Sequence, residues 1–117
     1  MIGSGNHMRL AILLLIAIVS LRAQETTHKT QPKLIRKVEP QYTDEARAAR
    51  LQGTVVLSVT IDAEGVPADI KVVRRLGMGL DEKAVECLEQ WRFKPATDYF
   101  SEPVAAKATV EINFRLP

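Results

Sequence analysis

The sequence predicts an α+β fold, a two-layer sandwich in which two helices pack on one face of a three-stranded antiparallel sheet. Apolar and polar residues alternate with period two over 53–62, and a short turn containing Gly65 leads into a second alternating run. A third alternation fills 104–116. Stretches with helical spacing lie before the first run and before the third. The element order is therefore helix, strand, strand, helix, strand.

The first helix is expected to begin at Thr43, whose hydroxyl can cap free backbone N–H groups. Asp44 and Glu45 follow in the first turn, where the helix dipole favours acidic side chains. Tyr42, just before the cap, is placed to pack back on that turn. Gly53 is expected to stop the helix.

The second helix is expected to be capped by Asp81 and to run through Trp91, because apolar residues recur at helical spacing between them. Pro95 is expected to end this element. Cys87 lies within it beside Val85 and Leu88, which favours a small buried apolar side chain over a thiol that pairs with another chain.

Composition excludes several kinds of chemistry. Hydrophobic residues make up 46% of the chain, charged residues 26%, and the formal net charge is only +2, too small to indicate nucleic-acid binding. Both histidines, His7 and His28, precede the periodic region, and there is one cysteine, so no metal-ligand set and no activated nucleophile is expected. We therefore expect no cofactor, no small-molecule substrate and no enzymatic activity.

The N-terminal third predicts export. Residues 1–7 look like a cloning scar or a misassigned start, and 8–23 combine Arg9 with an apolar run of about a dozen residues, typical of a signal peptide. Retention of this run as a short inner-membrane anchor is the alternative interpretation. Residues 24–32 are expected to be a linker with a reach of about 35 Å, and 33–117 to be the folded domain.

A set of landmarks in fixed order resembles the C-terminal domain family of TonB. The landmarks are Pro40-Gln41-Tyr42, Gln52-Gly53-Thr54-Val55, Asp62-Ala63-Glu64-Gly65, Gly79-Leu80-Asp81 and Trp91-Arg92-Phe93-Lys94-Pro95-Ala96. The residues expected to carry the family's folding signature are Tyr42, Gly53, Gly65, Asp81, Trp91, Phe93 and Pro95.

The resemblance implies a module of the Gram-negative periplasm that binds a short peptide segment of TonB-dependent outer-membrane receptors in energy-coupled transport, with inner-membrane motor proteins as further partners. We expect the docking edge to be the last strand, Lys107 to Leu116, since strand addition satisfies open backbone groups. Its outward side chains are Lys107, Thr109, Glu111, Asn113 and Arg115. Energy-coupling members carry a long Pro-rich spacer, so the alternative is a structural or regulatory homodimer without energy coupling.

Overall fold

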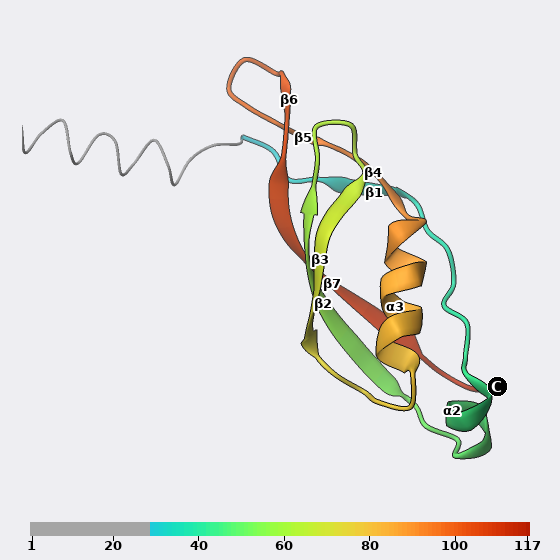
Figure 1. The fold of residues 1–117 in the computed structure, drawn as a ribbon. Coiled ribbons are helices and arrows are strands. Elements are labelled where there is room, and N and C mark those ends of the chain that lie inside the picture. The colour runs from blue at the N-terminus through green and yellow to red at the C-terminus, as the bar shows by residue number, and fades with distance from the viewer. Residues whose placement is uncertain (1–28) are drawn as a thin grey trace, which may run out of the picture.

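The structure is a computed structural model that describes residues 29–117. The expected start segment, the export segment and most of the linker lie outside the described residues. The three-stranded sheet has the order β3-β2-β7 and consists of β3 (Pro67–Arg74), β2 (Gly53–Ile61) and β7 (Ala106–Phe114). Helix α3 (Leu80–Glu89) lies across one face of this sheet, and α2 (Asp44–Ala48) sits at its lower end (Figure 1). The predicted fold class is confirmed.

The remaining strands form two small ribbons at the upper end of the sheet (Figure 1). In one ribbon β1 (Lys33–Arg36) pairs with β4 (Arg92–Lys94), and in the other β5 (Ala96–Thr97) pairs with β6 (Pro103–Val104). Both pairs are antiparallel. Among the described residues, no helix has the length and apolar character needed to cross a membrane.

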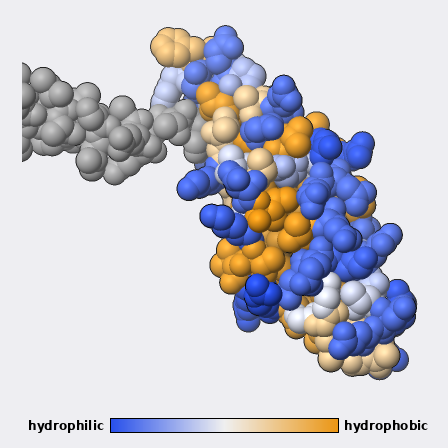
Figure 2. All heavy atoms as spheres, in the orientation of Figure 1, coloured by the Kyte–Doolittle hydropathy of each residue, from blue (hydrophilic) through white to orange (hydrophobic). Residues whose placement is uncertain are grey.

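The core lies between the sheet and α3. Alternate residues of β2 (Val55, Leu57, Val59 and Ile61) are almost fully buried, and Ile112 and Phe114 of β7 join them. The predicted apolar stripe of α3 faces this layer, with Leu80, Ala84, Leu88 and Trp91 all buried. Half-buried apolar residues of β3 and α3 extend the layer to the surface, and Figure 2 shows an apolar strip between these elements, bordered by hydrophilic side chains.

The start of α2 is as predicted, but its end is not. Thr43 Oγ1 accepts a hydrogen bond from the Ala46 N–H at 3.1 Å and donates one to the Met78 carbonyl at 2.7 Å. The predicted stop at Gly53 is wrong because the helix already ends at Ala48. Arg50 adopts the left-handed conformation with φ 54°, and the following Leu51 N–H returns to the Ala46 carbonyl at 3.0 Å. Arg50 thus takes the position usually given to glycine in this helix ending.

Tyr42 holds the end of β7 against α2. Its hydroxyl donates to the Leu51 carbonyl at 2.7 Å, and its ring meets Phe114 edge-on with centroids 5.6 Å apart. The Arg47 guanidinium lies over the same ring at 5.6 Å, the contact with the first turn that the sequence predicts. Gly53 begins β2, and a Cβ there would lie 2.7 Å from Cδ1 of Leu76.

Asp81 is important to α3, but it is not the N-cap that the sequence predicts. Gly79 occupies the cap position, and the buried Asp81 carboxylate lies in the first turn. It accepts the N–H groups of Leu76 at 2.7 Å and of Gly77 at 3.1 Å, both in the loop before the helix. The carboxylate therefore fixes the β3–α3 connection rather than the free N–H groups of α3 itself.

The residues after α3 also differ from the prediction. The helix ends at Glu89, and Arg92–Lys94 form β4 before the chain reaches Pro95, which lies between β4 and β5. Trp91 is buried and donates its Nε1–H to the Val38 carbonyl at 2.8 Å. Phe93 is buried in β4, with its ring centroid 6.3 Å from that of Trp91. The extended segment after β1 is thereby held against the core.

Gly65 ties the β2–β3 turn to β4. It has φ 83°, and its carbonyl accepts the Phe93 N–H at 3.0 Å. A Cβ at this position would lie 1.8 Å from the Phe93 carbonyl oxygen, a contact that only a backbone movement could relieve. Glycine is therefore required here for both conformation and space.

We expect Gly65→Ala to lower the free energy of unfolding by about 3 kcal/mol or more, because it adds backbone strain and displaces the bond to Phe93. Gly77→Ala is the matched control: Gly77 also has a left-handed φ, of 95°, but a Cβ there meets nothing within 4 Å. It should cost only about 1–2 kcal/mol. Urea unfolding of both variants measures the difference, and equal losses would contradict the close approach.

We expect Asp81→Ala to destabilise the protein by about 2–3 kcal/mol, because two N–H groups in a half-buried loop lose a charged acceptor. Asp81→Asn should cost less, since its amide oxygen still accepts one of the two bonds. Exposed Glu82, the next residue of α3, provides the control. Glu82→Ala should change the thermal midpoint little, and an equal effect of both alanine substitutions would refute the role assigned to Asp81.

Candidate functional site

The predicted docking strand, β7, lies at an edge of the sheet. It pairs with β2 from Ala106 opposite Ile61 to Phe114 opposite Gly53, without a shift in register. Within residues 29–117 no second strand pairs with β7. One row of its backbone N–H and carbonyl groups therefore faces away from the sheet.

Three contacts establish which residues form that row. The Asp62 N–H donates to the Val66 carbonyl at 3.0 Å, so the even-numbered residues of β2 direct their polar backbone groups toward β3. Pro67 lies opposite Ile61 and has no N–H to donate. This position therefore fits a pair whose two residues do not bond to each other, which means that Ile61 directs its backbone groups away from β3. The odd-numbered residues of β2 therefore bond to β7, and their partners there are even-numbered. Consistently, the Leu116 N–H reaches back to Gln52 Oε1 at 2.9 Å.

It follows that Lys107, Thr109, Glu111 and Asn113 direct their N–H and carbonyl groups to the open edge. Neighbouring residues of a strand direct their N–H and carbonyl groups to opposite sides. Because the even-numbered residues of β7 bond to β2, the odd-numbered residues must face the open edge. The open row is nine residues long from Ala106 to Phe114 and contains no proline. It is a regular template for one more strand.

The opposite edge of the sheet is less suited to pairing. β3 carries two shifts in register against β2, which leave Val73 and Asp69 as extra residues. Asp69 has φ 49°, and Pro67 begins the strand without a donor. Bulges and proline are features that hinder pairing at a sheet edge. β7 is thus the more regular of the two edges.

The side chains predicted for partner binding are exposed, but they do not share one environment. The five residues are Lys107, Thr109, Glu111, Asn113 and Arg115. Asn113 Oδ1 accepts the Thr54 hydroxyl at 2.6 Å, so this side chain is engaged within the sheet. Arg115 lies one residue beyond the end of β7. The predicted strand end at Leu116 is therefore two residues too long.

A cleft of about 280 Å³ lies at the C-terminal end of the β7 edge. Residues far apart in sequence line it: Glu39, Pro40 and Tyr42 on one wall, and Asn113, Phe114 and Arg115 on the other. The sequence did not reveal this first wall, because the segment before α2 has no periodicity that would place it beside the last strand. The edge of β7 that is free to pair with a further strand begins at Lys107 and ends at this cleft, because Asn113 and Phe114 line it.

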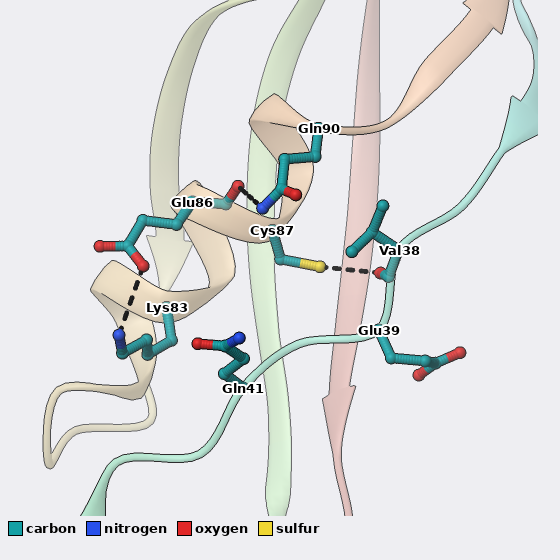
Figure 3. Close-up of a pocket in the computed structure, with 7 residues that line it drawn as sticks. All are labelled: Val38, Glu39, Gln41, Lys83, Glu86, Cys87 and Gln90. Atoms are coloured by element: carbon teal, nitrogen blue, oxygen red, sulfur yellow. Dashed lines mark hydrogen bonds and ion pairs between the residues drawn. The ribbon is translucent and has the colours of Figure 1, made fainter.

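A second cleft, of about 110 Å³, contains Cys87 and is shown in Figure 3. The Cys87 thiol points to the Val38 carbonyl at 2.9 Å, and burial raises the pKa of this thiol, so the protonated donor is favoured. Lys83 pairs with Glu86 at 3.4 Å, and Gln90 Nε2 donates to the Glu86 carbonyl. The lining of this cleft contains no histidine, and the Glu39 carboxylate in it raises the pKa of the thiol further, which disfavours the reactive thiolate. Burial of Cys87 agrees with its interpretation as a small packed side chain.

The part of the chain that the structure describes contains no cluster of three or more residues that could hold a metal ion. The edge of β7 offers backbone hydrogen bonds, with charged and hydroxyl side chains beside them. Such an edge can accept an extended peptide.

Comparison with known proteins shows the family to which the chain belongs. A family model described as the C-terminal region of the Gram-negative bacterial TonB protein matches residues 38–116. TonB of Vibrio cholerae serotype O1 (strain ATCC 39315 / El Tor Inaba N16961) is 32% identical over 95 residues, which cover 74% of this chain and 38% of that protein. The chain thus corresponds to less than half of that relative's length.

The fold comparison gives the same answer. The solution NMR structure of the Pseudomonas aeruginosa TonB CTD superposes with a TM-score of 0.60 at 27% sequence identity, covering 75% of this chain and 89% of the other. The family match spans the extended segment from Val38, both helices, the whole sheet and the signature residues from Tyr42 to Pro95. The chain belongs to the TonB C-terminal domain family.

Proposed function

We propose that this chain is a periplasmic protein-binding module that pairs β7 with a short peptide segment of a TonB-dependent outer-membrane receptor, and that it has no enzymatic role. The observation that carries the proposal is the open row at Lys107, Thr109, Glu111 and Asn113, on a strand with unbroken register. Family membership supports the class of partner.

Strand addition suits this edge better than side-chain recognition alone would. Backbone hydrogen bonds supply affinity that tolerates sequence variation, whereas the alternating side chains set which peptide is accepted. On the face of the sheet that α3 does not cover, an incoming strand would lie beside Lys107, Thr109 and Glu111, which offer a cation, a hydroxyl and an anion. On the other face it would run toward the cleft between Pro40 and Arg115.

We expect Thr109→Pro and Glu111→Pro each to weaken binding of a receptor peptide by about tenfold or more. Proline removes an outward N–H, and its ring blocks the approach of the added strand, while the bonds to β2 come from the even-numbered residues. Calorimetric titration with a synthetic peptide from the periplasmic segment of a TonB-dependent receptor measures the loss.

Thr109→Val is the matched control, because it keeps the N–H and changes only the side chain. It should retain affinity within about threefold of the parent if the backbone carries most of the binding. Circular dichroism and thermal unfolding establish that each variant is folded. Unchanged binding by both folded proline variants would mean that β7 is not the docking edge.

A second candidate function is homodimerisation through the same edge, and one pattern in β7 favours it. If two copies pair antiparallel about Thr109, Lys107 of each copy lies opposite Glu111 of the other. Opposite charges in this position stabilise a cross-strand pair, and the arrangement has the twofold symmetry of a dimer. Lys107, Thr109 and Glu111 would then contact a second copy of the chain instead of a receptor.

For the dimer we expect Glu111→Lys to weaken self-association, because it places lysines opposite each other. Adding Lys107→Glu should restore it, since the exchanged charges again attract across the twofold axis. Sedimentation velocity over a range of concentrations measures both effects. A double variant that associates no better than Glu111→Lys would eliminate this register, and dissociation of the dimer by receptor peptide would show that both use one edge.

A further inference from the structure

The β1–β4 ribbon places like charges opposite each other. Lys33 lies opposite Lys94, and Arg36 lies opposite Arg92. Because directly opposed residues of an antiparallel pair share a face, all four cations lie on the same side of the ribbon. The two ion pairs found within residues 29–117, Lys37 with Glu39 and Lys83 with Glu86, involve none of the four. Arg92 is half-buried and donates from Nη1 to the Glu89 and Trp91 carbonyls at 2.8 and 2.6 Å, whereas Lys33, Arg36 and Lys94 are exposed.

A loop between β5 and β6, with hydrogen bonds of its own, exposes two aromatic side chains. Tyr99 is 66% exposed and Phe100 is 85% exposed. The loop does not owe its shape to these rings, because Asp98 Oδ1 accepts the N–H groups of Phe100 at 2.8 Å and Glu102 at 3.0 Å. The Asp98 N–H also donates to the Glu102 carbonyl at 2.9 Å. The Asp98 carboxylate and the loop backbone thus fix the shape of the aromatic tip.

The ribbon and the tip belong to the same end of the molecule (Figure 1). β4 is followed within a few residues by β5 and the tip, and β1 adds two exposed apolar side chains, Leu34 at 44% and Ile35 at 69%. This end also receives the preceding chain, since the Lys29 N–H donates to the Thr97 carbonyl at 2.6 Å. Cations, aromatic rings and aliphatic side chains therefore all belong to the end of the fold where the N-terminal sequence joins it.

We propose that this end of the domain, comprising the β1–β4 ribbon and the Tyr99–Phe100 tip, docks on the surface of an anionic phospholipid bilayer. Basic side chains are attracted to acidic headgroups, and aromatic side chains favour the boundary between headgroups and acyl chains. The apolar run of residues 10–19 is the reason for proposing a bilayer rather than another partner. Nine residues separate this run from Lys29, and they can span about 30 Å. A bilayer that holds this run lies within reach of the tip.

The test uses the full chain in vesicles, because its N-terminal run can bind lipid by itself and only a local probe reports the tip. Phe100→Trp carries the probe, and the buried Trp91 gives a constant background. In vesicles of phosphatidylethanolamine and phosphatidylglycerol, its added emission should shift to the blue and be quenched by lipids brominated near the headgroup. Met78 lies in the β3–α3 loop, where its carbonyl accepts the hydroxyl of Thr43, the N-cap of α2, and α2 is at the end of the fold opposite the tip (Figure 1). It is 41% exposed, and Met78→Trp should show neither change.

The electrostatic part is tested with Lys33→Gln combined with Lys94→Gln in the Phe100→Trp background. Each basic residue at an anionic surface favours binding roughly fivefold, so the pair should lower the docking equilibrium by about 25-fold. Arg74→Gln with Arg75→Gln removes the same charge from exposed residues where β3 ends, outside the ribbon and the tip, and should leave quenching unchanged. Vesicles of phosphatidylcholine alone should give weak quenching, as should high salt.

Emission from Phe100→Trp that stays water-like and unquenched in the anionic vesicles would overturn the proposal and leave an acidic protein surface as the partner of this end. Equal quenching with and without the lysine substitutions would also overturn it, since the cations would then contribute nothing. The outcome is independent of receptor binding, because β7 carries none of the substituted residues.

Discussion

The nine-residue ladder between β2 and β7 is the constraint on which the rest of the structure depends. Its unbroken register aligns the buried residues of both strands on the face that α3 covers. The same register fixes which backbone groups of β7 bond inward and which face the open edge. A slip of one residue would place the core side chains in solvent and reverse the row that a partner would meet. Fold and candidate site therefore have one origin.

Much of the fold could be predicted because its strands encode their faces locally. The alternation around Leu57 and Val110 identifies β2 and β7, and Thr43 identifies the start of α2. Helix ends and caps were harder. Arg50 adopts a conformation that sequence patterns assign to glycine, and Asp81 bonds to the loop before α3 rather than to its own helix. Such contacts depend on tertiary packing, and the helix propensities of single residues carry no information about it.

The candidate site could be predicted only in outline. The exposed side chains of β7 follow from its alternation, but the direction of its backbone groups required the β2–β3 turn at Asp62. The β1–β4 ribbon joins segments separated by more than fifty residues, and β1 is exposed along its whole length, so no buried face marks it in the sequence. Residues without a burial pattern give little local signal about what they pair with.

The bulges of β3 have a consequence for assembly. A sheet with two regular edges can keep adding strands and can extend into a fibre, whereas here regular growth is available only beside β7. In a symmetric dimer joined through β7 the outermost strand on both sides is β3, so regular growth of the sheet ends with two domains. A bound peptide occupies the β7 edge of a single domain and prevents that pairing.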